Sequence, residues 1–167
     1  MKRTFAHTLI FIALTYSSCV DKPTYPSQPV ITYKDFIRYG NLANPDSVEL
    51  VVAFTDNEGD VGLGQTDVQG IFSIGNIFMD YYSWDTAGAD HWSPVDNPLT
   101  PAIDTFRIAY RVPPVLPEGD LAEPMKGLVR VKQKPFIKVF DKIMYVVYLY
   151  DKAGHRSDTI HTPPIIF

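Results

Sequence analysis

The sequence is poor in cysteine, because its 167 residues include only one, Cys19. A single cysteine can form neither an internal disulfide nor a multi-cysteine zinc site, which excludes disulfide scaffolds and zinc-finger domains. Positive charge is also scarce, with 15 Lys and Arg against 19 Asp and Glu. The resulting net charge of −4 argues against a nucleic-acid-binding protein, which would carry a basic face.

The sequence also lacks the signatures of common catalytic centres. It contains no G-x-S-x-G nucleophile elbow, no H-E-x-x-H zinc motif and no G-x-x-x-x-G-K phosphate-binding loop. We therefore predict a protein that is not an enzyme. The alternative is a glycan hydrolase, because paired carboxylates can cleave glycosidic bonds and the chain contains many of them.

No apolar run of the chain is long enough to span a membrane, which requires about 20 apolar residues. Residues 5–14 form an apolar stretch that follows a basic start and precedes two serines. This order is typical of a secretory signal peptide. We predict that residues 1–18 are such a peptide and are cleaved from the mature chain.

Cys19 directly follows the two serines, at the position where a signal peptidase would cut. This placement resembles the lipobox of bacterial lipoproteins, whose cysteine is acylated and becomes the new N-terminus. Tyr16 stands where that family usually has Leu. The resemblance implies that acyl chains such as palmitate on Cys19 hold the protein on a membrane, since two or three chains give stable anchoring. The alternative is ordinary secretion with a free thiol.

The rest of the chain divides into a short tether and one folded domain. Three prolines lie within residues 20–29, which predicts an extended, semi-rigid tether over residues 19–29. Beyond it, apolar and polar residues alternate with period two, as they do in half-buried strands. The segments with strand character are residues 30–38, 48–54, 75–83, 106–112, 129–132, 143–150 and 157–160.

These segments predict an all-β domain over residues 30–167. About seven strands separated by Gly and Pro turns favour an immunoglobulin-like antiparallel β-sandwich, with a β-barrel as the alternative. Residues 143–150 are apolar on both faces. We therefore expect this strand to lie centrally in its sheet.

Three segments resemble the small envelope lipoproteins of Bacteroidota. They are VAFTDNEGDVGL at 52–63, YRVPPVLPEGDLAEPMKG at 110–127 and VYLYDKAGHRSDTIHTPP at 147–164. Those proteins have a strand followed by an Asp- and Gly-rich loop, and a late strand that ends in a D-[RK]-A-G-[NH]-x-S turn. The resemblance implies an Ig-like sandwich on the outer membrane, facing the periplasm or the cell surface, and it implies no particular activity.

An acidic loop follows the second predicted strand and is a candidate metal site. Asp56, Glu58 and Asp60 alternate along it, and Asp67 stands twelfth from Asp56, so the loop could offer hard oxygen ligands to Ca²⁺. Val61 occupies the sixth position, where an EF-hand loop requires Gly. Any site would therefore be calcium held in a β-loop. The alternative is a solvated turn whose Asp and Gly residues serve the backbone geometry.

Aromatic residues gather in the middle of the chain and form a candidate ligand-binding surface. Tyr82, Trp84, His91 and Trp92 flank a short polar segment. Such side chains can stack on sugar rings or anchor a protein partner. The alternative is that they cover an open end of the sandwich.

Together these patterns predict a lipid-anchored protein of the cell envelope that acts as a non-enzymatic binding or structural module. Its expected partners are the membrane, through the N-terminal lipid, and an envelope protein or glycan. Nucleic acid is not among them. A passive subunit of a larger assembly is a further alternative, and it would expose an apolar patch or an unpaired sheet edge.

Overall fold

A computed structural model of the chain describes residues 22–41, 44–85, 91–99, 104–115, 122–134 and 140–167. The predicted signal peptide and Cys19 lie outside these residues. No helix in the described part of the chain is both long and apolar enough to cross a membrane.

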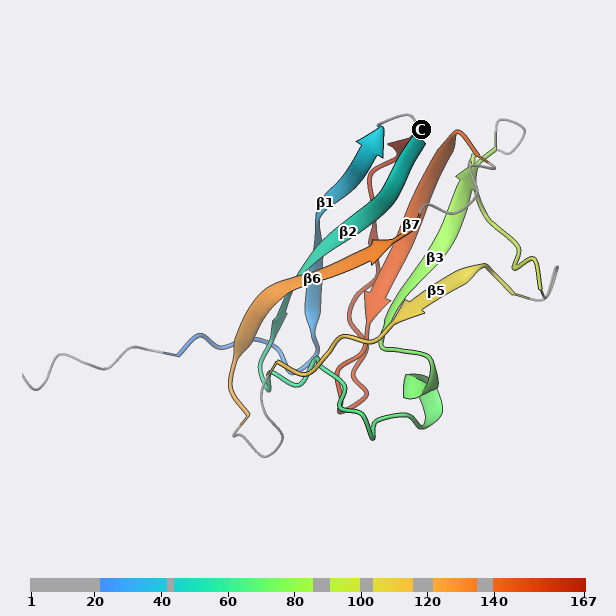
Figure 1. The fold of residues 1–167 in the computed structure, drawn as a ribbon. Helices are drawn as coiled ribbons and strands as arrows, with labels where there is room; N and C mark the ends of the chain where they lie inside the picture. The colour runs from blue at the N-terminus through green and yellow to red at the C-terminus, as the bar shows by residue number, and fades with distance from the viewer. Residues whose placement is uncertain (1–21, 42–43, 86–90, 100–103, 116–121, 135–139) are drawn as a thin grey trace, which may run out of the picture.

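The fold is a β-sandwich of two antiparallel sheets, as the alternation predicts (Figure 1). The first sheet has the order β1–β2–β6, with β1 at Val30–Asn41, β2 at Asn44–Asp56 and β6 at Met125–Gln133. The second sheet is built on the pair of β3 (Ile77–Trp84) and β7 (Lys142–Leu149). On one side of this pair, β4 (Trp92–Pro94) and β5 (Arg107–Tyr110) both pair with β3. On the other side, β8 (Ile160–His161) and β9 (Ile165–Ile166) pair with β7.

The strand order is that of an immunoglobulin-like sandwich. Strands β1, β2 and β6 share one sheet, while the consecutive strand β3 crosses to the other and pairs with β7. Strand β7 is central, as its two apolar faces predict, because it pairs with β3 on one side and with β8 and β9 on the other. More strands form than the seven expected, because the edges of the second sheet are built from short pieces. The last of the expected strands is displaced, with β8 at Ile160–His161 instead of 157–160.

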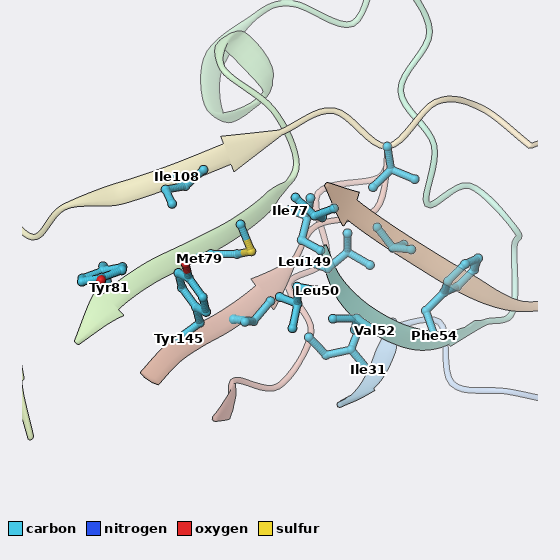
Figure 2. Packing of buried hydrophobic residues seen from close by; sticks show 14 of the residues in the cluster. Ile31, Leu50, Val52, Phe54, Ile77, Met79, Tyr81, Ile108, Tyr145 and Leu149 are labelled. Atoms are coloured by element: carbon cyan, nitrogen blue, oxygen red, sulfur yellow. The ribbon is translucent and has the colours of Figure 1, made fainter. Parts of the chain in front are cut away.

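The core lies between the sheets, where alternate residues of each strand point inward (Figure 2). Leu50 and Val52 of the first sheet face Met79, Tyr145 and Leu149 of the second, and none of these side chains is more than 2% exposed. Burying side chains of this size stabilises the fold by about 1.5–3 kcal/mol each. The sandwich therefore holds together without a disulfide.

The outward face of the second sheet is also rich in aromatic rings. Phe78 and Tyr148 stack with their ring centres 5.2 Å apart. Arg107 lies over both rings and forms two hydrogen bonds to Asp80, of 2.6 and 3.0 Å. Arg156 covers Tyr148 with its guanidinium carbon 4.1 Å from the ring centre. Cation–π contacts of this kind shield the rings from water and leave Phe78 and Tyr148 buried on an outer face.

The two ends of the sandwich differ in chemistry. Strands β2 and β7 finish at one end, which we call the acidic end because Asp56 and Asp151 lie there. Strand β3 runs from this end to the opposite one and finishes at Trp84, so we call the opposite end the aromatic end (Figure 1). At about 3.3 Å per residue, the eight residues of β3 separate the two ends by roughly 25 Å.

Candidate functional site

Three carboxylates converge at the acidic end of the sandwich. Asp56 is the last residue of β2, Asp60 follows it in the loop, and Asp151 comes two residues after the end of β7. One oxygen from each of these three residues lies within 4.8 Å of the other two. Asp56 and Asp151 are completely buried, and Asp60 is partly buried. We call these three residues the acidic triad.

Hydrogen bonds hold the acidic triad in place but leave some of its oxygens without a partner. The backbone N–H of Asp60 donates to Asp56 Oδ2 over 3.0 Å, and that of Lys152 donates to the Asp60 carbonyl over 2.9 Å. His155 donates its backbone N–H to Asp151 Oδ1 over 2.7 Å and places its Nδ1 2.8 Å from Oδ2. Asp56 Oδ1 and Asp60 Oδ1 are buried and accept no hydrogen bond from any described residue.

The electrostatics of the acidic triad reflect an excess of negative charge. Burial, together with the nearby charges of Asp60 and Asp151, raises the pKa of Asp56 to about 6. Burial also raises the pKa of Asp60, with a second contribution from Asp151. The hydrogen bond from His155 to Asp151 raises the pKa of that histidine. A raised pKa means that the negative charge of a buried carboxylate is poorly compensated by its surroundings. An added positive charge would stabilise such a group.

Two of the predicted metal ligands lie outside the acidic triad. Glu58 accepts a hydrogen bond from Ser27 Oγ over 3.0 Å through Oε1, while its buried Oε2 accepts none from the described residues. Asp67 turns away, because its Oδ2 accepts the Gly64 N–H over 2.8 Å and pairs with Lys152 Nζ at 3.3 Å. The hydrogen bond from Gly64 keeps the pKa of Asp67 below its usual value. Asp67 therefore closes a local turn and does not complete a twelve-residue loop.

The side chain of Asn76 joins the segments around the acidic triad. Its Nδ2 donates to the carbonyls of Val61, over 2.6 Å, and Tyr150, over 2.9 Å. Its Oδ1 accepts the N–H of Val112 over 2.9 Å. Asn76 is completely buried and follows Gly75, whose φ of 150° and closeness to the Tyr110 carbonyl favour a residue without a Cβ. One side chain thus fixes the acidic loop against the chain that leaves β7.

The segment before β1 also lies against the acidic end. The backbone N–H of Tyr25 donates to Asn57 Oδ1 over 3.3 Å, and Gln28 Nε2 donates to the Arg156 carbonyl over 2.7 Å. With the bond from Ser27 to Glu58, these contacts connect the predicted tether to both the acidic loop and the turn after β7.

The predicted aromatic residues come together at the aromatic end. Trp84 and Trp92 occupy paired positions on β3 and β4, and their rings meet edge to face with centres 5.1 Å apart. His91 stacks on Trp84 with the ring centres 4.7 Å apart, and Lys142 Nζ lies 3.4 Å from the centre of the same ring. Tyr82 is half-buried on the same face of β3, two residues before Trp84. We call these five residues the aromatic cluster.

The two tryptophans of the aromatic cluster are not equally available. The Trp84 ring is in close contact with both the His91 ring and the Lys142 ammonium group. Lys142 Nζ is more distant from Trp92, at 5.5 Å from its ring centre. Both tryptophans are partly exposed, so Trp92 offers the freer aromatic surface.

Comparisons of the chain with protein-family models, curated proteins and solved structures find no match. The acidic triad and the aromatic cluster are therefore the two candidate sites that the chain's own geometry provides. Sequence reasoning identified the aromatic cluster apart from Lys142, and it identified Asp56 and Asp60 of the acidic triad. It missed Asp151 and Asn76.

Replacing Asn76 with Ala should destabilise the fold by about 2–4 kcal/mol, because three buried backbone groups lose their partner at once. Urea unfolding followed by circular dichroism measures this change. Asn97→Ala is the matched control, since the Asn97 side chain accepts the N–H of Leu99 at an exposed turn. Equal stability of the two variants would show that Asn76 does not join these segments.

Proposed function

We propose that this protein is a lipid-anchored, non-enzymatic module of the bacterial cell envelope that contacts an envelope protein or glycan. The observation that supports this proposal is the placement of the N-terminal segment and the aromatic cluster at opposite ends of the sandwich. A chain held on the outer membrane at Cys19 would keep its acidic end near the lipid and present its aromatic end away from it.

The contacts of the N-terminal segment support a short connection to the lipid. Tyr25, Ser27 and Gln28 bind the body of the domain, so at most residues 19–24 of the predicted tether would separate the lipid from it. Six extended residues span about 19 Å at 3.1 Å per residue. The acidic end would then lie close to the membrane, which orients the domain.

The aromatic cluster supports contact with a partner. Partly exposed tryptophans beside a lysine provide flat apolar surface together with a charge, a combination that suits sugar rings and protein hot spots. The cluster continues along the outward face of the second sheet through Tyr82 to Arg107 and Phe78. Trp92 is the residue that we expect to carry most of the contact.

The geometry supports binding over glycan hydrolysis. A glycosidase needs two carboxyl groups that reach the sugar from either side of the bond it cleaves. Three carboxylates converge in the acidic triad, and two of them, Asp56 and Asp151, have no exposed surface. They cannot flank a sugar.

A passive subunit of a larger assembly is the second candidate. Val68, Ile71 and Ile74 lie in one loop around the short 3₁₀ helix η2 (Gly70–Ser73) and are 53%, 46% and 63% exposed. Apolar side chains exposed together are typical of a contact surface.

Metabolic labelling with a palmitate analogue tests the anchor. Label should enter the wild-type chain and be absent from Cys19→Ser, because the variant has no thiol to acylate. Ser17→Ala is the control, since it keeps a small residue before the cysteine and should remain labelled. Equal label in the wild type and Cys19→Ser would refute acylation at this residue.

Tryptophan fluorescence tests the aromatic end, because the only two tryptophans of the chain both belong to the aromatic cluster. Titration with soluble envelope oligosaccharides and purified envelope proteins should change the emission. Trp92→Ala should weaken the binding by about 30-fold, as expected for loss of a hot-spot aromatic worth about 2 kcal/mol.

Tyr25→Ala is the control for this titration, because it removes a partly exposed ring at the acidic end. It should bind as the wild type does. If no oligosaccharide or envelope protein binds, or if Trp92→Ala binds as tightly as the wild type, contact through the aromatic end is refuted.

A further inference from the structure

We propose that the acidic triad is a Ca²⁺ site, with Asp56, Asp60 and Asp151 as ligands. This inference does not depend on the proposed function, because it needs neither a lipid nor a partner. It also differs from the ligand set that the sequence predicts, since it includes Asp151 and leaves out both Glu58 and Asp67.

The spacing of the oxygens fits a calcium ion. Ligand oxygens lie about 2.3–2.6 Å from Ca²⁺, so two oxygens on opposite sides of one ion are roughly 4.8 Å apart. The three carboxylate oxygens of the triad lie within 4.8 Å of one another. Calcium also tolerates irregular sets of oxygen ligands, whereas Mg²⁺ demands near-octahedral geometry at about 2.0–2.1 Å and keeps several waters. Ligands that come from two separate turns form an irregular set, which suits Ca²⁺ better than Mg²⁺.

A second observation points to a ligand among these carboxylates. Asp56 is completely buried, yet its Oδ1 accepts no hydrogen bond from the described residues, and the same is true of Asp60 Oδ1. A buried, unpartnered carboxylate oxygen is costly unless a cation or a proton compensates it. No Lys or Arg in the described ranges forms an ion pair with either residue, and the neighbouring Lys152 pairs with Asp67.

An ion at this position would connect three segments of the chain. Asp56 and Asp60 belong to the loop after β2, and Asp151 belongs to the turn after β7. Asn57 and Glu58, between the first two ligands, hold Tyr25 and Ser27 of the N-terminal segment. Calcium would therefore close the acidic end and fasten the chain that leads toward Cys19.

Calorimetric titration and thermal melting of the metal-free full chain test the site. Titration with CaCl₂ should saturate at one ion per chain, and MgCl₂ should bind more weakly. At a calcium concentration of 100 times the dissociation constant, the melting temperature should rise by roughly 5–10 °C. EGTA should reverse the rise.

Asp56→Asn should abolish the calcium response, since it removes a ligand charge but keeps an oxygen that can accept the Asp60 N–H. Without calcium this variant should melt at or above the wild-type temperature, because it loses a buried repulsive charge, so loss of folding would not explain a lost response. Asp67→Asn is the matched control and should respond as the wild type does, because Asp67 lies outside the triad.

Several results would overturn the proposal. A wild-type chain that neither binds nor is stabilised by calcium would show that a proton on Asp56 relieves the repulsion instead. A full calcium response in Asp56→Asn, or loss of the response in Asp67→Asn, would refute this set of ligands.

Discussion

The side chain of Asn76 is the constraint on which the acidic end of this sandwich depends. It binds the backbone of the acidic loop, of the chain after β5 and of the chain after β7 in one buried position. The two sheets pack at the core through apolar contacts, which are not directional. The hydrogen bonds of Asn76 are directional, and they fix the loop that carries Asp60 beside the turn that carries Asp151. The convergence of three carboxylates is thus a consequence of how the sheets are joined.

Much of the fold could be predicted from the sequence, because a half-buried strand repeats its polarity every two residues. This holds for β2 and for β7, where Ile143, Tyr145, Val147 and Leu149 all point into the core. Short edge strands such as β4 and β9 were not predicted, because two or three residues cannot display a period. The aromatic cluster could be predicted because its members flank one hairpin, whereas Lys142 joins it only through the pairing of β3 with β7.

The acidic site could be predicted only in part. Asp56 and Asp60 are close in the chain, but Asp151 reaches them because β2 and β7 end at the same end of the sandwich, and no local pattern contains that information. Counting twelve residues from Asp56 leads to Asp67, whose carboxylate contacts Lys152 and the Gly64 N–H and lies outside the triad. The sequence does show that Asp151 is the first acidic residue after the most apolar predicted strand.

The central claim is that a cation bound at the acidic end links three segments of the chain and stabilises them together. Hydrogen–deuterium exchange with and without calcium tests this directly, because backbone amides exchange more slowly where local opening is suppressed. Calcium should slow exchange together in residues 56–60, in residues 151–155 and in residues 25–28, and leave residues 92–95 at the aromatic end unchanged. Unchanged exchange in all of them, or slowing confined to one segment, would contradict the claim.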